Sequence, residues 1–184
     1  MRRKSHVLGI FIDLSKAFDT IDHSTLLVKL DRYEIHGNAN SLIKSYLSNR
    51  TQYTDVLGEK SNPLIIKYGV PQGSVLGPLL FLLYINDIAN SSNLGTFVLF
   101  ADDTNIFVEG HSIEDAYRKG NELLRSVKKY MLLNKLHINM SKCCYVHFKP
   151  KVRENALSEN DLELSIDGFP IKKKQDSKVS WSCS

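Results

Sequence analysis

The chain has 184 residues, 42% of them hydrophobic and 24% charged, and its formal net charge is +4. This length and balance fit a soluble globular domain that buries a core of its own. The longest apolar stretch, Val75 to Ile85, contains Pro78 and is shorter than the roughly 20 residues of a membrane-spanning helix, so no membrane segment is expected. The mildly basic charge permits a nucleic-acid partner without requiring one.

The N-terminus and the cysteines indicate the compartment. Residues 1–6 lead directly into a strand-length apolar run and lack the pattern of a secretory signal. The three cysteines, Cys143, Cys144 and Cys183, have neither the density of a disulfide framework nor the spacing of a zinc site. These features predict an intracellular protein.

Apolar periodicity, capping residues and turn residues predict the elements of the chain. In chain order these are a strand from Val7 to Leu14, a helix that begins after residues 20–24 and ends near Gly37, a short helix over 41–47, a hairpin of 51–57 and 64–68 joined by 58–63, an apolar helix from Val75 to Asn86, a hairpin of 96–101 and 105–109, a long amphipathic helix from Ser112 to Leu136, and a strand from Cys144 to Phe148. Residues 149–171 are predicted to be a linker with a small hairpin around Asp167-Gly168, and residues 172–184 a disordered tail.

The order of these elements indicates the fold class. Without the β-rich insert at 51–68, the predicted order is strand, helix, strand, strand, helix, strand. This order is typical of an α+β, ferredoxin-like (split βαβ) arrangement, in which helices cover one face of an antiparallel sheet.

Two carboxylate sites stand at the ends of apolar strands that are far apart in the sequence. Asp13 follows the run from Val7 to Ile12, and Asp102-Asp103 follow the run from Phe97 to Phe100. An acid at the end of a buried strand is costly unless it meets a metal ion or another cation. If the two strands are neighbours, their acids can share divalent cations, as in phosphoryl transfer. Taken alone, Asp102-Asp103 also fit an ordinary hairpin turn, where aspartate is common.

Three segments carry a more specific signal. In this order, they resemble successive motifs of the reverse transcriptase palm: Phe11 to Asp19, Gly69 to Pro78 and Phe100 to Thr104. Their residues are most similar to those of non-LTR (LINE-type) retrotransposons. Asn134 to Cys144, with Lys142, resembles a fourth motif. The resemblance implies that residues 1–148 form a polymerase palm and that 149–171 include part of a primer-grip-like hairpin.

The resemblance also implies roles for individual residues. Asp13 and Asp102 would hold two Mg²⁺ ions, for which Mn²⁺ can substitute, and Asp103 would be a supporting acid. Phe18 would lie under the sugar of the incoming nucleotide and exclude a 2′-hydroxyl, although an ordinary core phenylalanine is an equal alternative. The remaining site residues would be Gln72 and Gly73, which line the nucleotide and template pocket, and Lys142 near the triphosphate, where a solvated lysine is the alternative.

The implied reaction is RNA-directed DNA synthesis, in which the 3′-oxygen of a primer attacks the α-phosphate of a dNTP and releases pyrophosphate. The implied partners are an RNA template, a DNA primer and dNTPs, and the family is expected in the nucleus or the cytoplasm. Met1 stands twelve residues before Asp13, so the sequence is interpreted as a palm fragment without fingers or thumb, whose activity is impaired. Two alternatives are a non-catalytic remnant that binds nucleic acid or protein, and another two-metal enzyme on the same scaffold, such as a nucleotide cyclase, against which Gln72-Gly73 argue.

Overall fold

A computed structural model describes residues 5–71, 73–148 and 162–174. The chain divides into two compact units. The sheet unit comprises residues 1–15, 87–133 and 137–184, and the helical unit comprises residues 16–86 and 134–136. Within the described ranges, every helix is too short or too polar to cross a membrane.

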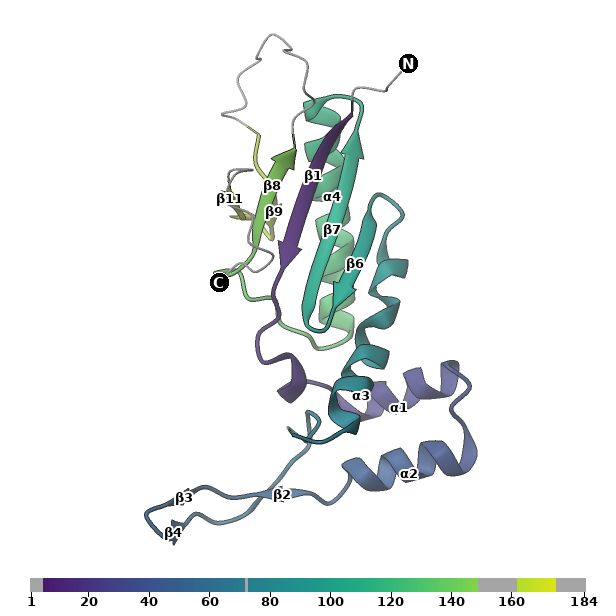
Figure 1. Cartoon of the computed structure of the whole chain (residues 1–184), viewed down its shortest axis with the longest axis vertical. Helices are drawn as coiled ribbons and strands as arrows, with labels where there is room; N and C mark the ends of the chain where they lie inside the picture. Colours follow the sequence, from purple (N-terminus) through teal and green to yellow (C-terminus); the bar gives the residue numbers. More distant parts are fainter. Residues whose placement is uncertain (1–4, 72, 149–161, 175–184) are drawn as a thin grey trace. The chain divides into compact units, whose positions relative to one another are not determined.

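The sheet unit is built on a five-stranded sheet with the strand order β11-β8-β1-β7-β6 (Figure 1). The strands are β1 (His6–Ile12), β6 (Thr96–Phe100), β7 (Asp103–Gly110), β8 (Cys144–Phe148) and β11 (Lys172–Lys174). All neighbours are antiparallel except β11 and β8, which are parallel. The expected strands at both carboxylate sites are therefore present, and they lie in one sheet.

Strand β11 corrects the prediction of a disordered tail from residue 172. Lys172, Lys173 and Lys174 pair with Cys144, Tyr145 and Val146 of β8. The segment forms a strand although it has no apolar period. An edge strand is held by backbone hydrogen bonds and tolerates lysines that face solvent. The predictions for residues 149–161 and 175–184 lie outside the described residues.

One face of the sheet packs against the long helix α4 (Ile113–Leu133), as Figure 1 shows. The core between them contains buried apolar side chains from β1, β7 and α4: Leu8, Ile10, Ile106, Val108, Leu123, Leu124, Val127 and Met131. Helix α4 ends three residues earlier than predicted, and Lys135 has a φ of 55°, a conformation that a right-handed helix cannot continue through.

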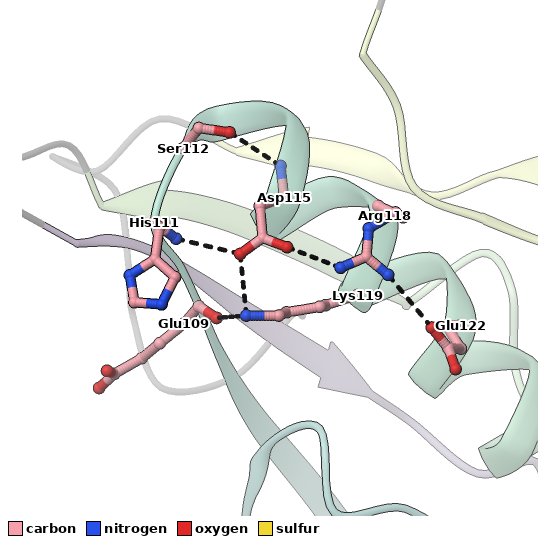
Figure 2. A network of polar contacts seen from close by, with 7 residues as sticks. All are labelled: Glu109, His111, Ser112, Asp115, Arg118, Lys119 and Glu122. Atoms are coloured by element: carbon pink, nitrogen blue, oxygen red, sulfur yellow. Dashed lines mark hydrogen bonds and ion pairs between the residues drawn. The ribbon is translucent and has the colours of Figure 1, made fainter.

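The start of α4 is fixed by a polar network centred on Asp115 (Figure 2). Ser112 Oγ accepts a hydrogen bond from the Asp115 backbone N–H at 3.1 Å, and Asp115 accepts one from the His111 backbone N–H at 3.1 Å. Lys119 and Arg118 pair with the same carboxylate at 2.8 and 2.7 Å. Hydrogen bonds from Lys119, His111 and Arg118 hold the pKa of Asp115 well below its usual range. Arg118 and Lys119 therefore stabilise the start of the helix, and their presence needs no nucleic-acid contact to explain it.

The predicted small hairpin after residue 161 is present in the sheet unit. Strands β9 (Ser165–Ile166) and β10 (Phe169–Pro170) pair across Asp167-Gly168, and both turn residues have positive φ. Leu164, just before β9, is buried, and Lys128 of α4 pairs with Asp167 at 3.1 Å. The hairpin is thus attached to α4 by both apolar and charged contacts.

The helical unit contains most of the remaining elements. These are η1 (Ala17–Asp19), α1 (His23–Arg32), α2 (Gly37–Leu47), α3 (Leu76–Ile85), and the short strands β2 (Thr51–Gln52), β3 (Asp55–Val56), β4 (Glu59–Lys60) and β5 (Leu64–Ile65). The segment η2 (Asn86–Ser91) follows α3 directly and belongs to the sheet unit from Asp87 onward. Helix α2 begins four residues before its predicted start. The hairpin turns at Leu57-Gly58 and not over 58–63, because both residues take the positive φ that a two-residue turn needs.

Asp22 is the buried polar centre of the helical unit. It caps α1 by accepting a hydrogen bond from the Thr25 backbone N–H at 2.8 Å, and the Ser24 hydroxyl also donates to it. Lys135, 113 residues further along the chain, donates to its other oxygen at 2.6 Å. Burial alone would raise the pKa of Asp22, but the hydrogen bonds from Lys135, Ser24 and Thr25 outweigh it and hold this pKa far below its usual range.

Replacing Asp22 by alanine is expected to lower the free energy of unfolding by about 2–3 kcal/mol, since a helix cap and the partner of Lys135 are lost together. Because the pKa is lowered in the folded chain, the stabilisation is present above the ordinary aspartate pKa of about 3.9 and is lost as the pH falls below it. Urea unfolding of both chains at a series of pH values measures this. Asp31→Ala, on the exposed end of the same helix, should cost about 0.5 kcal/mol or less. A loss for Asp22→Ala that does not shrink in acid would contradict the assignment.

Candidate active site

The strand register brings the predicted acids to one edge of the sheet. Ile12, the last residue of β1, pairs with Thr104 of β7, and Phe100, the last residue of β6, pairs with Asp103. Asp13 follows Ile12, and Asp103 precedes Thr104, so both acids stand at the same end of the β1–β7 pair. Their side chains are half-buried. The sheet therefore joins two carboxylate sites that are about ninety residues apart in the sequence.

Asp102 lies in the turn between β6 and β7. The two strands are joined by Ala101 and Asp102 alone, since Phe100 and Asp103 already pair. Ala101 has a φ of 52°, a conformation that costs a non-glycine residue roughly 1 kcal/mol or more. This tight turn places Asp102 and Asp103 in succession at the sheet edge.

The acids interact electrostatically across the strands. Burial, the Asp102 carboxylate and the Asp13 carboxylate together raise the pKa of Asp103, while Lys142 acts in the opposite direction. The charges of Asp13 and Asp102 therefore both reach Asp103. A cation placed among these groups would relieve their repulsion.

A turn before β8 supplies the nearby positive charge. The backbone N–H of Asn139 donates to the Asp13 carbonyl at 2.9 Å, and the N–H groups of Lys142 and Cys143 donate to the Asn139 carbonyl. Lys142 Nζ lies 4.0 Å from Asp13 Oδ1. Burial raises the pKa of the Cys143 thiol, and a hydrogen bond with the Asp13 backbone opposes that rise. Asn139 and Cys143 were not predicted, since backbone contacts of this kind leave no pattern in the sequence.

The carboxylates at this edge match a divalent cation in ligand type. Clustered carboxylates on a half-buried edge are the hard oxygen ligands that Mg²⁺ prefers. Within the described residues, however, no group of three or more His, Cys, Asp or Glu side chains is arranged to hold a metal ion by itself. The described part of the chain thus offers the right ligand type but does not complete a coordination shell.

The other predicted site residues belong to the helical unit. Phe18, in η1, is half-buried, and its ring centroid lies 4.9 Å from that of Phe81 in α3. A cavity of about 470 Å³ is lined by Phe18, Pro71, Gly73 and residues of the α3 N-terminus. Gly73 has a φ of 76°, and a Cβ there would meet no atom within 4 Å. Phe18 and Gly73 therefore share one cavity, while Gln72 lies outside the described residues.

The chain matches the family model "Reverse transcriptase (RNA-dependent DNA polymerase)" over residues 1–180. It is 32% identical over 155 residues to the RNA-directed DNA polymerase from mobile element jockey of Drosophila melanogaster, which covers 80% of this chain and 17% of that protein. It is 28% identical over 178 residues to the probable RNA-directed DNA polymerase from transposon BS of the same species, covering 93% of this chain and 20% of that protein. The chain thus spans about a fifth of the length of these relatives.

Solved structures show the same fold at low sequence identity. A telomerase from Candida tropicalis, in complex with a fragment of telomeric RNA, matches with a TM-score of 0.62 and 12% identity, over 93% of this chain and 29% of that one. The apo telomerase of the same species, truncated from its C-terminal domain, matches with a TM-score of 0.59. These structural matches and the family match show that the chain has a mixed α/β fold, which it shares with telomerase. The chain therefore belongs to the reverse transcriptase (RNA-dependent DNA polymerase) family, together with these polymerases from mobile elements.

Proposed function

We propose that the chain carries the catalytic centre of an RNA-directed DNA polymerase, which adds a dNTP to a primer 3′-hydroxyl by two-metal nucleotidyl transfer. The observation that supports this most is the grouping of Asp13, Asp102 and Asp103 at one sheet edge, close enough for the first two to raise the pKa of the third. Two-metal sites use such shared carboxylates to stabilise the attacking and leaving oxygens.

Asp13 and Asp102 would hold Mg²⁺, with Asp103 as a supporting acid. An all-protein shell is unnecessary, because Mg²⁺ is usually held by one or two carboxylates together with substrate phosphates and waters. Bound Mg²⁺, or Mn²⁺ in its place, would supply acidification of the primer hydroxyl and neutralisation of the charge on pyrophosphate. Lys142, 4.0 Å from Asp13, would add positive charge beside the triphosphate.

The cavity at Phe18 and Gly73 would hold the nucleotide. The Phe18 ring is supported by Phe81, so it presents a fixed apolar surface. A 2′-hydroxyl against that surface would lose its hydrogen bonds with water, which disfavours ribonucleotides. By the resemblance of its motif, Gln72 would take part in binding the nucleotide and the template.

The sheet would be a palm of the split βαβ type. The strand order β8-β1-β7-β6, antiparallel throughout and backed by α4, supports this assignment. RNA template, DNA primer and dNTPs are the proposed partners, since jockey and BS are described as RNA-directed DNA polymerases. A nuclear or cytoplasmic location accords with this reaction.

The isolated chain is expected to bind Mg²⁺ and a dNTP weakly and to lack processive extension, because positioning of both substrates supplies much of the catalysis of phosphoryl transfer. Calorimetric titration with dTTP, in Mg²⁺ and in excess EDTA, tests the first part. Extension of an oligo(dT) primer on poly(rA) tests the second. Equal dTTP affinity in Mg²⁺ and in EDTA would contradict the proposed metal-dependent site. Long extension products from the chain alone would contradict the expected loss of processive synthesis.

A further inference from the structure

The helical unit contains a second and larger cavity that the proposed reaction does not use. Its volume is about 730 Å³, within the range of roughly 300–1,000 Å³ typical of ligand sites. It lies between the end of α2, the base of the β2–β5 ladder and the segment 69–71. Of its lining, only Pro71 also lines the cavity at Phe18 and Gly73. The two cavities are therefore largely separate.

Arg50 gives this cavity an oriented positive charge. Its Nε donates to the Tyr46 carbonyl at 2.7 Å, and its guanidinium lies 4.6 Å from the centroid of the Tyr46 ring. No carboxylate in the described part of the chain pairs with Arg50. Tyr46 thus holds the Nε edge and one face of the guanidinium. The two terminal nitrogens are left to bind a ligand. A guanidinium held in this way suits the two oxygens of a phosphate.

Tyr68 gives the same cavity an exposed aromatic face. Its backbone forms an antiparallel bridge with Asp22, the buried cap of α1, so its position is fixed. The side chain is nevertheless 53% exposed. An exposed aromatic ring on a backbone that is held in place is a surface on which a base can stack.

The remaining polar groups favour a nucleotide over a simple anion. Asp19, Thr51 and Gln52 also line the cavity. The Thr51 hydroxyl and the Gln52 amide can hydrogen-bond the sugar and the base edges of a nucleotide, groups that a simple anion does not have. A duplex, which hides its base faces, could not use Tyr68 in this way.

We propose that this cavity binds one or two nucleotides of a single-stranded polynucleotide, with a phosphate on Arg50 and a base stacked on Tyr68. The choice of a polynucleotide rests on the proposed function, but the site itself uses neither Asp13 nor Asp102 and needs no metal.

Fluorescence anisotropy with labelled hexamers of rU and of dT, measured in EDTA, tests the proposal on the intact chain. Arg50→Ala and Tyr68→Ala are each expected to weaken binding about 5- to 100-fold, and Tyr68→Phe to stay within about twofold, because it keeps the ring. Arg50→Ala should also reduce the slope of log K against log salt by about 0.7, while Tyr68→Ala leaves the slope unchanged. The two hexamers decide whether the strand is RNA, DNA or either.

Matched variants separate this site from general charge and aromatic effects. Arg32→Ala removes an exposed arginine of the same unit, and Tyr53→Ala removes a tyrosine that is 51% exposed on the hairpin; neither residue lines the cavity. Both should bind the hexamers as the unchanged chain does. The proposal would be overturned if the controls lost as much affinity as Arg50→Ala and Tyr68→Ala, or if those two variants lost none. It would also be overturned if inorganic phosphate displaced the hexamers equally well from the unchanged chain and from Tyr68→Ala. The hexamers are measured in EDTA and the dTTP titration in Mg²⁺, so a failure of the polymerase assignment remains distinguishable from a failure of this site.

Discussion

Replacing Asp13 by asparagine is expected to weaken Mg²⁺-dependent binding of a dNTP by about 100-fold or more, since a first ligand to the metal is lost and even outer partners are worth about 10- to 100-fold. Asparagine keeps the shape of the side chain but not its charge, and the charge is what holds a hard cation. Asp102→Asn should behave in the same way, and Asp103→Asn should lose about tenfold or less as a supporting acid. Calorimetric titration of dTTP in Mg²⁺ measures the three losses.

A structural role for Asp13 predicts a different result, and thermal unfolding separates the two. Without metal, Asp13→Asn should unfold at the same temperature as the unchanged chain or higher, because it removes a charge that repels Asp103. Stabilisation by added Mg²⁺ and dTTP should disappear with binding. Asp167→Asn removes a carboxylate of the same unit that pairs with Lys128, and it should leave nucleotide binding unchanged. Equal losses in Asp167→Asn and Asp13→Asn would refute the proposed metal site.

Gly69→Ala is expected to lower the free energy of unfolding by about 3 kcal/mol, because two effects add. Gly69 has a φ of 84°, a conformation that L side chains rarely adopt. In addition, a Cβ would lie 2.8 Å from the Asp19 Cα and 2.9 Å from the Phe18 carbonyl oxygen, and both atoms are backbone. The segment would have to separate from η1, where the Val70 N–H now donates to that same carbonyl at 2.9 Å.

Gly58→Ala is the matched control for this change. Gly58 has a φ of 91°, yet a Cβ there would meet nothing within 4 Å. Only the backbone strain remains, which should cost about 1 kcal/mol. Urea unfolding of both variants measures the difference, and similar losses would show that close packing at Gly69 is not what holds Phe18 in place.

Local patterns in the sequence were sufficient for much of the fold. The alternation and length of apolar runs predicted β1, β7, β8 and the amphipathic α4, because these elements have a period that one strand or helix expresses by itself. The pairing of β6 with β7 was also predictable, since a short turn joins them. The prediction of disorder was wrong for β11, because the partner of that strand is 28 residues away and its own lysines carry no apolar signal.

The site divides in the same way. Asp13, Asp102, Asp103, Phe18, Gly73 and Lys142 were predicted by resemblance to motifs, which depends on residue type and spacing alone. The resemblance gave no role to Asn139 or Cys143, although both fall within the fourth motif, and it did not predict the buried link from Asp22 to Lys135. Each of these depends on a contact between segments that only meet after folding.

The sequence by itself determined the family, the identity of the candidate acids and the position of most strands and helices. Tertiary structure alone decided that Asp13 and Asp103 stand at the same edge of the sheet, and that Arg50 and Tyr68 line one cavity. The physical reason is that local periodicity fixes which face a side chain occupies within its own element. Which element lies beside it depends on register and packing between distant residues, and no single segment encodes these.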